Sequence, residues 1–369
     1  MSEASTGSPA GATSFPCVSC GAGLEFSPGT ATLKCPYCGH ENRLEQPLEQ
    51  VQELDFYDFF ARAAEQGESE EKQTVTCSSC GATSTVDNNI SMNRCPFCGA
   101  PLTAPAKASR LIKPGAILPF KVTSAKAAEA FRDWISGLWF APGELKGFAN
   151  ASGGIRGMYI PYWTYDSRVT TQYIGQRGED YYVTEQYAEE DSTGKAVTRS
   201  RQVTRTRWSS ANGTVENRFD DVQVLAGKSL PAGIIASLEP WDLQNLVPYS
   251  EEYMSGFQAE AYQIDMGEGF EKAKGIMEDV VRRSIERDIS GDRQQITTVR
   301  SQYDDITFKH ILLPVWISAY HYRDRTYRFI VNARTGQVQG ERPWSVLKVT
   351  LAVIVVLFAL LMFALLVQR

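Results

Sequence analysis

Eight cysteines constrain this chain more than any other feature, because all of them fall into four Cys-x-x-Cys pairs. Two pairs fourteen residues apart form a first set, and every cysteine of the second set lies sixty positions after its counterpart. The flanking letters repeat too: CVSCGA and KCPYCG first, then CSSCGA and RCPFCG. Doubled pairs at this spacing are typical of zinc ribbons, in which four thiolates hold one ion. The sequence therefore predicts ribbons at 15–45 and 75–104, each with one structural Zn²⁺. The eight predicted metal ligands are Cys17, Cys20, Cys35, Cys38, Cys77, Cys80, Cys95 and Cys98.

Other uses of Cys-x-x-Cys fit this pattern less well. Redox-active pairs occur singly at a helix start, and disulfides need an oxidising compartment. Four protein ligands leave no open coordination position, which indicates a structural rather than a hydrolytic metal. The opening letters MSEASTGSPAGATSF contain neither the basic nor the apolar stretch of a signal peptide. We therefore expect a flexible tail over 1–14 and a chain that stays in the reducing cytosol.

One segment near the C-terminal end is apolar enough to cross a membrane. Within residues 349–367 only Thr350 is polar, and as a helix this segment would span about 28 Å. Trp344 and Lys348 precede it as interfacial anchors. The alternative is a buried core helix, but such a helix normally keeps a polar stripe. We expect a single-pass transmembrane helix over 346–367 that acts as a tail anchor in the cytoplasmic membrane, with the bulk of the chain cytosolic.

The charge of the N-terminal region separates the classes of partner. Residues 1–109 carry six Lys and Arg against thirteen Asp and Glu, a net charge of −7. Phosphate contacts need clustered cations, so this composition favours protein partners and disfavours nucleic acid. Between the ribbons, Leu54, Tyr57 and Phe60 recur at near-helical spacing among acidic residues. This pattern predicts an acidic helical linker over 46–74.

Residues 110–345 alternate strand and helix patterns, which indicates an α+β region with antiparallel sheets. The fold class expected for the whole chain is α+β, with two small ribbons at one end and a transmembrane helix at the other. We divide the region into units at 110–255 and 256–345. Each unit contains a capped helix followed by a strand with a Pro-x-Trp element, at 160–163 and 313–316. This repeated order indicates a diverged duplication.

Local signals place the elements of these units. Thr123 and Asp265 are the predicted helix N-caps. Short strands are expected before them, at 118–122 and 262–264, and a hairpin at 327–338. The side chains expected to be buried are Ala127, Ala128, Phe131, Trp134 and Ile135 on the first helix, and Phe270, Ala273, Ile276, Met277 and Val280 on the second.

Four arginines between 199 and 207 would share one face of a strand. Such a row could bind phosphate or lipid head groups. If the chain turns near 191–195, however, each arginine faces a carboxylate or a tyrosine of the preceding strand. In that register Arg199 lies opposite Tyr187, Arg201 opposite Glu185, Arg205 opposite Tyr181 and Arg207 opposite Glu179. We favour the paired register, and a slip of one residue would leave the row free.

Common catalytic motifs are absent from the sequence. It contains no GxxxxGK[ST], GxGxxG, HExxH or GxSxG, and neither His310 nor His321 has the spacing of a second metal site. We therefore expect a binding or scaffold protein that recruits protein partners at the cytosolic membrane face, rather than an enzyme. The alternative is a nucleic-acid-associated factor, such as a replication or transcription accessory, without helicase activity. A third alternative is an enzyme without a recognised motif, which a deep pocket with shifted carboxylates in the large region would favour.

Several stretches together carry a family resemblance: the two ribbons, YIPYWTYDS, FDDVQVLAGKSLP, LEPWDLQNLVPY, ITFKHILLPVW, YRFIVNARTGQVQGERPWS and the apolar C-terminal segment. The chain resembles a bacterial family of double zinc-ribbon, membrane-anchored proteins of unknown function. Some members carry the label primosomal protein N′-like helicase. A helicase needs a phosphate loop, which this sequence lacks, so the resemblance implies ribbons and an anchor but no helicase residues.

Overall fold

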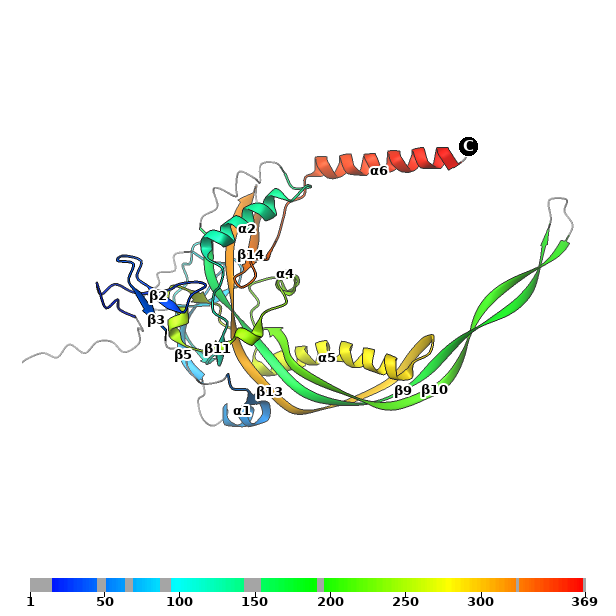
Figure 1. Cartoon of the computed structure of the whole chain (residues 1–369), viewed down its shortest axis with the longest axis horizontal. Coiled ribbons are helices and arrows are strands. Elements are labelled where there is room, and N and C mark those ends of the chain that lie inside the picture. The colour runs from blue at the N-terminus through cyan, green and yellow to red at the C-terminus, as the bar shows by residue number, and fades with distance from the viewer. Residues whose placement is uncertain are drawn as a thin grey trace, which may run out of the picture.

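The computed structural model describes residues 15–44, 51–63, 69–86, 94–142, 154–190, 196–322 and 325–367. It shows a mixed α and β fold with antiparallel sheets, two clusters of four cysteines and one apolar helix near the C-terminal end. The predicted fold class is therefore confirmed. The expected flexible tail at 1–14 lies outside the described residues. Figure 1 shows a body of sheets and helices from which a long two-stranded arm projects.

Two small sheets build the ribbons. The first ribbon contains β1 (Glu25–Phe26), β2 (Thr32–Lys34) and β3 (Glu41–Arg43), in that spatial order. The second contains β6 (Thr83–Thr85), β5 (Ser69–Thr76) and β7 (Lys107–Ile112), again in spatial order. The second ribbon thus recruits strands from both sides of the 75–104 interval expected for it.

A nine-stranded sheet forms the centre of the body. Its main path runs β10 (Ala196–Leu225), β9 (Arg156–Glu190), β13 (Arg293–Tyr322), β14 (Arg325–Asn332) and β15 (Val338–Gly340), with all neighbours antiparallel. The short strands β4 (Leu54–Asp55), β8 (Ala116–Ile117), β11 (Val247–Pro248) and β12 (Gln258–Ala259) join it at the sides. The helices are α1 (Phe56–Ala63), α2 (Ser124–Ser136), α4 (Ala232–Ala236), α5 (Met266–Ile289) and α6 (Val346–Val367), with 3-10 turns η1 (Leu243–Asn245) and η2 (Glu251–Met254).

The two Pro-x-Trp elements meet at the centre of this sheet. β9 and β13 pair antiparallel with Ile160 opposite Leu313, the residues that begin the two elements. On its outer side each strand pairs with the next strand of its own unit. β9 and β10 form the first hairpin, and β13 and β14 form the second hairpin. This is the local two-fold order that a duplicated helix–hairpin unit would give. The two expected units share one sheet, so the boundary at 255–256 does not separate two independently packed bodies.

The helices of the two units are exchanged across the sheet. α2 belongs to the first unit but packs on the second hairpin, where the Phe131 ring stacks on Phe329 with centroids 3.4 Å apart. α5 belongs to the second unit but packs on the first hairpin, where the Tyr173 hydroxyl donates to the Asp288 carboxylate. Each hairpin therefore buries its apolar face under the helix of the other unit.

Two tryptophan indoles hold this crossed arrangement in place. Trp316 Nε1 donates to the Val122 carbonyl oxygen at 2.7 Å, and Trp163 Nε1 donates to the Ile264 carbonyl oxygen at 2.8 Å. Val122 and Ile264 each stand immediately before the N-cap residue of a helix. Each Pro-x-Trp strand thus anchors the start of the helix that belongs to the other unit.

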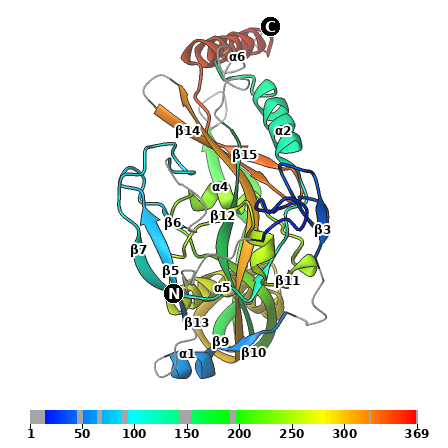
Figure 2. The same ribbon diagram turned by 90° about the vertical axis from the view of Figure 1, so that its left-hand side faces the viewer.

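The sheet has a different cover on each face, because side chains alternate along its strands. On β9, Tyr159 and Trp163 face the layer that contains α2, α5 and the first ribbon. Met158 and Ile160 face the opposite layer, which contains the second ribbon and α4. Figure 2 shows the first ribbon, in dark blue, and the second, in light blue and cyan, on either side of the body.

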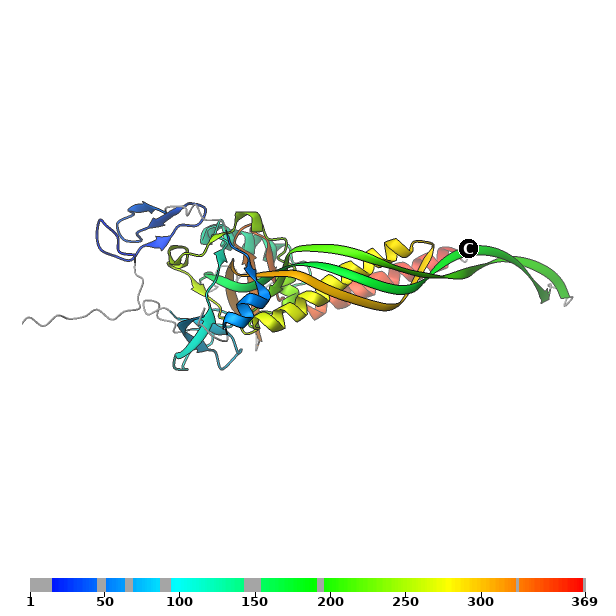
Figure 3. The same cartoon turned by 90° about the horizontal axis from the view of Figure 1, so that it is seen from below.

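The arm is the part of β9 and β10 that extends past the sheet (Figure 3). β13 begins at Arg293, which lies opposite Gly178 of β9. Among the described strands, residues 179–190 and 196–207 therefore pair only with each other. The length of this hairpin was not predicted from the sequence.

Several local predictions are confirmed, and others are wrong. Thr123 and Asp265 are N-caps whose side chains accept hydrogen bonds from the amides of Lys126 and Glu268. The predicted hairpin is formed by β14 and β15. Among the residues expected to be buried, Ile276 is 48% exposed, because it lies on the outer face of α5.

The strands expected before the two N-caps are misplaced. The ladder residues are those of β8 and β12, whereas 118–122 and 262–264 form no strand. The physical reason is that the Val122 and Ile264 carbonyl groups bond to tryptophan indoles instead of to a neighbouring strand. The expected helical linker at 46–74 is also shorter than predicted: α1 is helical, but 69–74 belongs to β5, which pairs with β7.

α6 contains the apolar segment found in the sequence. Its most apolar window of 18 residues, within Val346–Leu366, has a mean hydropathy of 3.1, and none of this window is buried in the protein. A soluble core helix of this composition would be covered. α6 is therefore long and apolar enough to cross a membrane.

Candidate metal centres

The structure gathers the eight predicted cysteines into two clusters of four. In the first ribbon Cys17 Sγ lies 3.6 Å from Cys38 Sγ, and Cys20 Sγ lies 3.5 Å from Cys35 Sγ. The second ribbon repeats this arrangement at 3.7 Å and 3.6 Å for the counterparts sixty positions later. In each cluster the four sulfur atoms lie within 4.8 Å of one another.

The knuckle backbone explains why the thiols converge. In each Cys-x-x-Cys-Gly turn, the glycine amide donates to the carbonyl oxygen of the first cysteine, for example Gly21 to Cys17 at 2.8 Å and Gly81 to Cys77 at 2.8 Å. The glycine that follows each pair has a positive φ between 74° and 75°. Glycine adopts this left-handed conformation without a steric penalty. Each local turn therefore orients the two thiols of its own pair, and contact between two knuckles completes each cluster.

The clusters fit a tetrahedral four-thiolate metal ion. With metal–sulfur bonds of about 2.3 Å, the edges of such a tetrahedron measure about 3.8 Å, close to the sulfur–sulfur distances found here. Four protein ligands would saturate the ion, so the chemistry it supplies is structural. The assignment of the eight cysteines as ligands stays a prediction, and the geometry is compatible with it.

Protonation opposes metal binding in both clusters. Hydrogen bonds from the backbone, the Cys38 amide first, lower the pKa of the Cys35 thiol to about 6, whereas burial raises the pKa of Cys95. A bound cation must displace the protons of thiols whose pKa is raised, such as Cys95. Metal affinity should therefore fall as the pH falls.

The first ribbon is fastened to the segment that joins the two units. The Phe26 amide donates to the Ser255 carbonyl oxygen at 2.9 Å, and the Phe26 ring packs edge-on against Tyr253 with centroids 5.2 Å apart. The Gly29 amide donates to the Phe120 carbonyl oxygen at 2.9 Å. These contacts join the ribbon to the layer that contains α2.

The second ribbon is fastened to the same segment a few residues later. The Ala261 amide donates to the Thr83 carbonyl oxygen at 2.9 Å, and the Thr85 hydroxyl donates to the Ala259 carbonyl oxygen at 3.1 Å. The ribbons therefore hold the connection at 255–261 from both sides. Metal bound in either ribbon would stabilise the junction between the two units.

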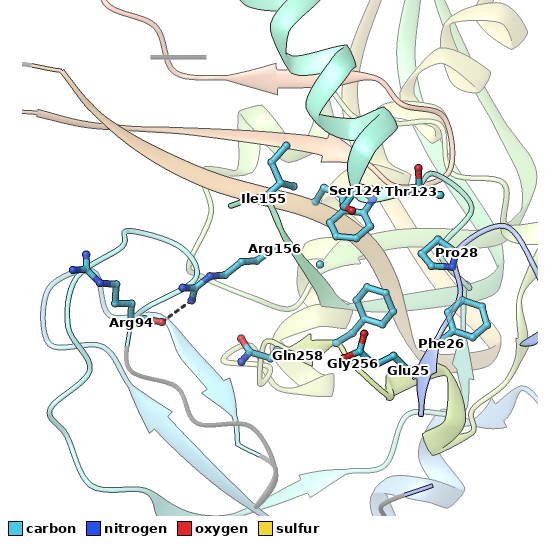
Figure 4. A pocket seen from close by; sticks show the side chains of 13 residues that line it. Glu25, Phe26, Pro28, Arg94, Thr123, Ser124, Ile155, Arg156, Gly256 and Gln258 are labelled. Atoms are coloured by element: carbon cyan, nitrogen blue, oxygen red, sulfur yellow. Dashed lines mark hydrogen bonds between the residues drawn. The ribbon is translucent and has the colours of Figure 1, made fainter. Parts of the chain in front are cut away.

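A cleft of about 620 Å³ lies where the ribbons approach each other (Figure 4). Glu25 and Phe26 line it from the first ribbon, Arg94 from the second, and Thr123 from the start of α2. Arg156 crosses between them and donates to the Arg94 carbonyl oxygen at 3.1 Å. Both signs of charge line the cleft, so its electrostatics select no single class of ligand.

The arginine row on the arm has the paired register predicted from the sequence. The four opposed pairs are Arg199 and Tyr187, Arg201 and Glu185, Arg205 and Tyr181, and Arg207 and Glu179. Glu185 forms an ion pair with the directly opposed Arg201. Diagonal contacts complete the row: Glu185 also pairs with Arg205, Glu189 pairs with Arg199, and the Arg207 guanidinium group lies over the Tyr181 ring. Each guanidinium group therefore has a carboxylate or aromatic partner within the arm.

The structure also shows a polar group that the sequence did not reveal. Glu53, Asp166 and Asp220 bring carboxylate oxygens within 4.8 Å of one another. Lys309 inserts beside them and forms ion pairs with Glu53 at 2.9 Å and Asp221 at 2.7 Å. The Lys309 ammonium group offsets part of the negative charge of these carboxylates. We therefore assign no metal ion to the three acidic residues. Its acidic members come from distant parts of the chain, so no sequence spacing could have indicated it.

His310 is buried and lies outside both cysteine clusters. Its Nδ1 lies 2.9 Å from the Ile112 carbonyl oxygen, and burial lowers its pKa to about 4. The His310 side chain therefore serves the packing of the core, as expected for a histidine without metal-ligand spacing. The side chain of His321 lies outside the described set.

Comparison with known proteins gives one informative match. The chain is similar to the uncharacterized protein YdjG of Bacillus subtilis (strain 168), with 27% identity over 338 residues that cover 90% of each chain. No family model matches the sequence, and no solved structure matches it. Over nearly its whole length the chain is thus similar to a bacterial protein, and the two four-cysteine clusters are compatible with zinc ribbons.

Proposed function

We propose that this chain is a membrane-tethered double zinc-ribbon protein that recruits a protein partner at the cytosolic face of the inner membrane. Zn²⁺ is the proposed ion in both clusters, because tetrahedral four-cysteine sites are its usual structural sites. α6 is the proposed tether, a tail anchor with one pass. The reducing cytosol is the proposed side for the ribbons, since free thiols persist there.

One observation carries the recruiting role: the knuckle tips of the first ribbon display apolar side chains. Val18 and Tyr37, one from each knuckle, are 79% and 84% exposed. Both sit on turns fixed by the Cys-x-x-Cys geometry, so a partner would meet a preorganised apolar tip. Aromatic side chains held in this way are frequent anchors of protein interfaces.

Binding of a partner suits this site better than catalysis does. Saturated four-thiolate ions leave no coordination position for a substrate or a water molecule. The nucleic-acid alternative loses its main support, because the arginine row is engaged within the arm and residues 1–109 carry a net charge of −7.

A photo-cross-linking experiment tests the recruiting role. A photoreactive phenylalanine analogue replaces Tyr37 in cells that make the full chain, and membranes are then irradiated. We expect discrete cross-linked adducts from this position. The matched control carries the analogue at Tyr182 of the arm, which is 74% exposed, and should give none of these adducts.

Two further variants connect the adducts to the metal. Cys17→Ala should abolish the Tyr37 adducts, because it removes a predicted ligand of the same ribbon. Cys77→Ala, in the other ribbon, should leave them in place. Identical adduct patterns from Tyr37, Tyr182 and Cys17→Ala chains would remove the first ribbon from the account of recruitment. Co-flotation of the full chain with lipid vesicles tests the tether separately.

A further inference from the structure

An exposed aromatic segment follows α2. The helix ends at Ser136 with Gly137 as its C-cap, and the next residues are Leu138-Trp139-Phe140-Ala141. Trp139 is 81% exposed and Phe140 is 36% exposed. Two adjacent aromatic side chains that are exposed to solvent indicate a surface that contacts an apolar partner or a membrane.

Hydrogen bonds fasten this segment to the first turn of α6. The Ser345 amide donates to the Phe140 carbonyl oxygen at 2.7 Å. Lys348 Nζ donates to the carbonyl oxygens of Trp139 at 3.1 Å and Ala141 at 2.8 Å. Figures 1 and 2 both show the C-terminal end of α2 near the start of α6. The aromatic segment therefore lies where the candidate membrane helix begins.

The side chains around this junction are arranged as at a membrane interface. The Phe140 and Trp344 rings lie 6.1 Å apart, and the Arg342 guanidinium group lies 4.6 Å from the centroid of the Trp344 ring. An apolar groove runs from these two rings along α6 over 349–357. Tryptophan and arginine favour the headgroup level, whereas the aliphatic face of a spanning helix favours the acyl chains below.

We propose that Leu138–Ala141 is a second membrane contact, with Trp139 and Phe140 inserted at the headgroup level of the bilayer that α6 enters. The occupant of this surface is lipid, because the aromatic segment is continuous with the apolar face of α6. The inference rests on the proposed membrane tether and deepens it. A helix alone would leave the body free to swivel, whereas a helix plus an adjacent aromatic segment fixes its orientation to the membrane.

Tryptophan fluorescence tests the contact with the full chain in phosphatidylcholine vesicles. Lipids brominated near the headgroup quench tryptophans at that depth, and acrylamide quenches those in water. Trp139 and Trp344 are the tryptophans beside α6, so Trp139→Phe should remove about half of the lipid-quenchable emission. The matched control, Trp208→Phe on the arm, removes a 43% exposed tryptophan and should reduce acrylamide quenching while leaving lipid quenching unchanged.

The outcomes separate this inference from the tether. Vesicle flotation with unchanged lipid quenching in Trp139→Phe would overturn the second contact and leave the tether in place. Failure of the wild-type chain to float would instead contradict the tether itself. Loss of about half of the lipid-quenchable emission in Trp139→Phe, with normal flotation and unchanged circular dichroism, is the result expected from the proposal.

Discussion

The two ribbons have the same knuckle backbone but different surroundings. At matching positions of the second knuckle, Tyr37 of the first ribbon is 84% exposed, whereas Phe97 of the second is fully buried. The last ligand follows the same trend: Cys38 is exposed and Cys98 is buried. The second knuckle of the first ribbon thus points into solvent, and that of the second ribbon lies in the core beneath the central sheet.

The difference shows that the arrangement of the thiols is set by neighbours along the chain, whereas burial of a knuckle is set by tertiary packing. Hydrogen bonds and a glycine within each turn place the thiols, so both ribbons arrange them alike. Burial depends on the face of the sheet that each ribbon meets. We interpret the second ribbon as part of the scaffold and the first as the ribbon that presents its tip. The predictions below test this difference.

The largest expected effect is the loss of a metal site. Cys35→Ala and Cys95→Ala should each lower the bound zinc from two equivalents to one, because three thiolates and no fourth protein ligand hold the ion poorly. Structural zinc contributes about 10–16 kcal/mol of apparent binding free energy, which a small ribbon needs in order to fold. Elemental analysis checks the stoichiometry.

Hydrogen exchange should show where each ribbon unfolds. Cys95→Ala is expected to expose amides at 77–85 and 259–263, and Cys35→Ala those at 17–34 and 255–257. Zinc content that stays at two equivalents in either variant would contradict the ligand assignment.

A smaller effect is expected from the paired aromatic residues. Phe97→Ala should cost about 3–5 kcal/mol of unfolding free energy, the usual range for removing a buried aromatic ring. Tyr37→Ala should change it by no more than about 0.5 kcal/mol, because its ring is in solvent. Denaturant unfolding measures both, and equal costs would contradict the difference in burial.

The contact between the second ribbon and the connection at 255–261 should depend on pH for its stability, because Glu260 lies in it. This residue is 2% exposed, bridges to Ser84 and accepts hydrogen bonds from the Ser229 amide and hydroxyl, while burial raises its pKa from 4.5 to about 7. Because the folded state holds the Glu260 proton more tightly than the unfolded state does, the protonated carboxyl group contributes to the free energy of unfolding. This contribution is complete below pH 4.5. It is lost as the pH rises to about 7, by about 3 kcal/mol.

Glu260→Gln tests this dependence. The variant should lose that part of the stability difference between pH 5 and pH 8, as measured by denaturant unfolding at several pH values. Glu71→Gln, an exposed carboxylate on β5 of the same ribbon, is the control and should keep the wild-type profile. A wild-type profile in Glu260→Gln would show that the Glu260 carboxyl group does not titrate in this way.

The smallest effect should be equal in the two ribbons. Gly21 and Gly81 both have φ of 74°, and a methyl group at either position would meet no other atom within 4 Å. Gly21→Ala and Gly81→Ala should therefore each cost about 1–2 kcal/mol, from backbone strain alone. Unequal costs would show that the two knuckles are not equivalent turns.

The features that the sequence predicts well are those fixed by neighbours along the chain. The cysteine knuckles, the N-caps at Thr123 and Asp265, and the register of the arginine row all depend on short-range spacing and side-chain chemistry. The pairing of Arg201 with Glu185 is an example: a single turn length sets the whole ladder.

Features that depend on distant partners were not predictable in this way. A helical stripe shows that Phe131 is buried but not that its partner is Phe329 of the other unit. The same limit applies to burial of Phe97 against exposure of Tyr37, because both follow a Cys-Pro dipeptide in similar text. The exchange of helices and the length of the arm arise from tertiary packing, which periodicity does not record.

The exchange of helices has a consequence for synthesis on the ribosome. β9 and β10 are complete once Leu225 has been added, but the helix that covers their apolar face begins at Met266. Until then Val169 and Phe219 have no lid, and an uncovered strand pair invites association with other chains. Truncated chains that stop before α5 should therefore be clients of chaperones and proteases, whereas chains that reach Ile289 can close the first hairpin.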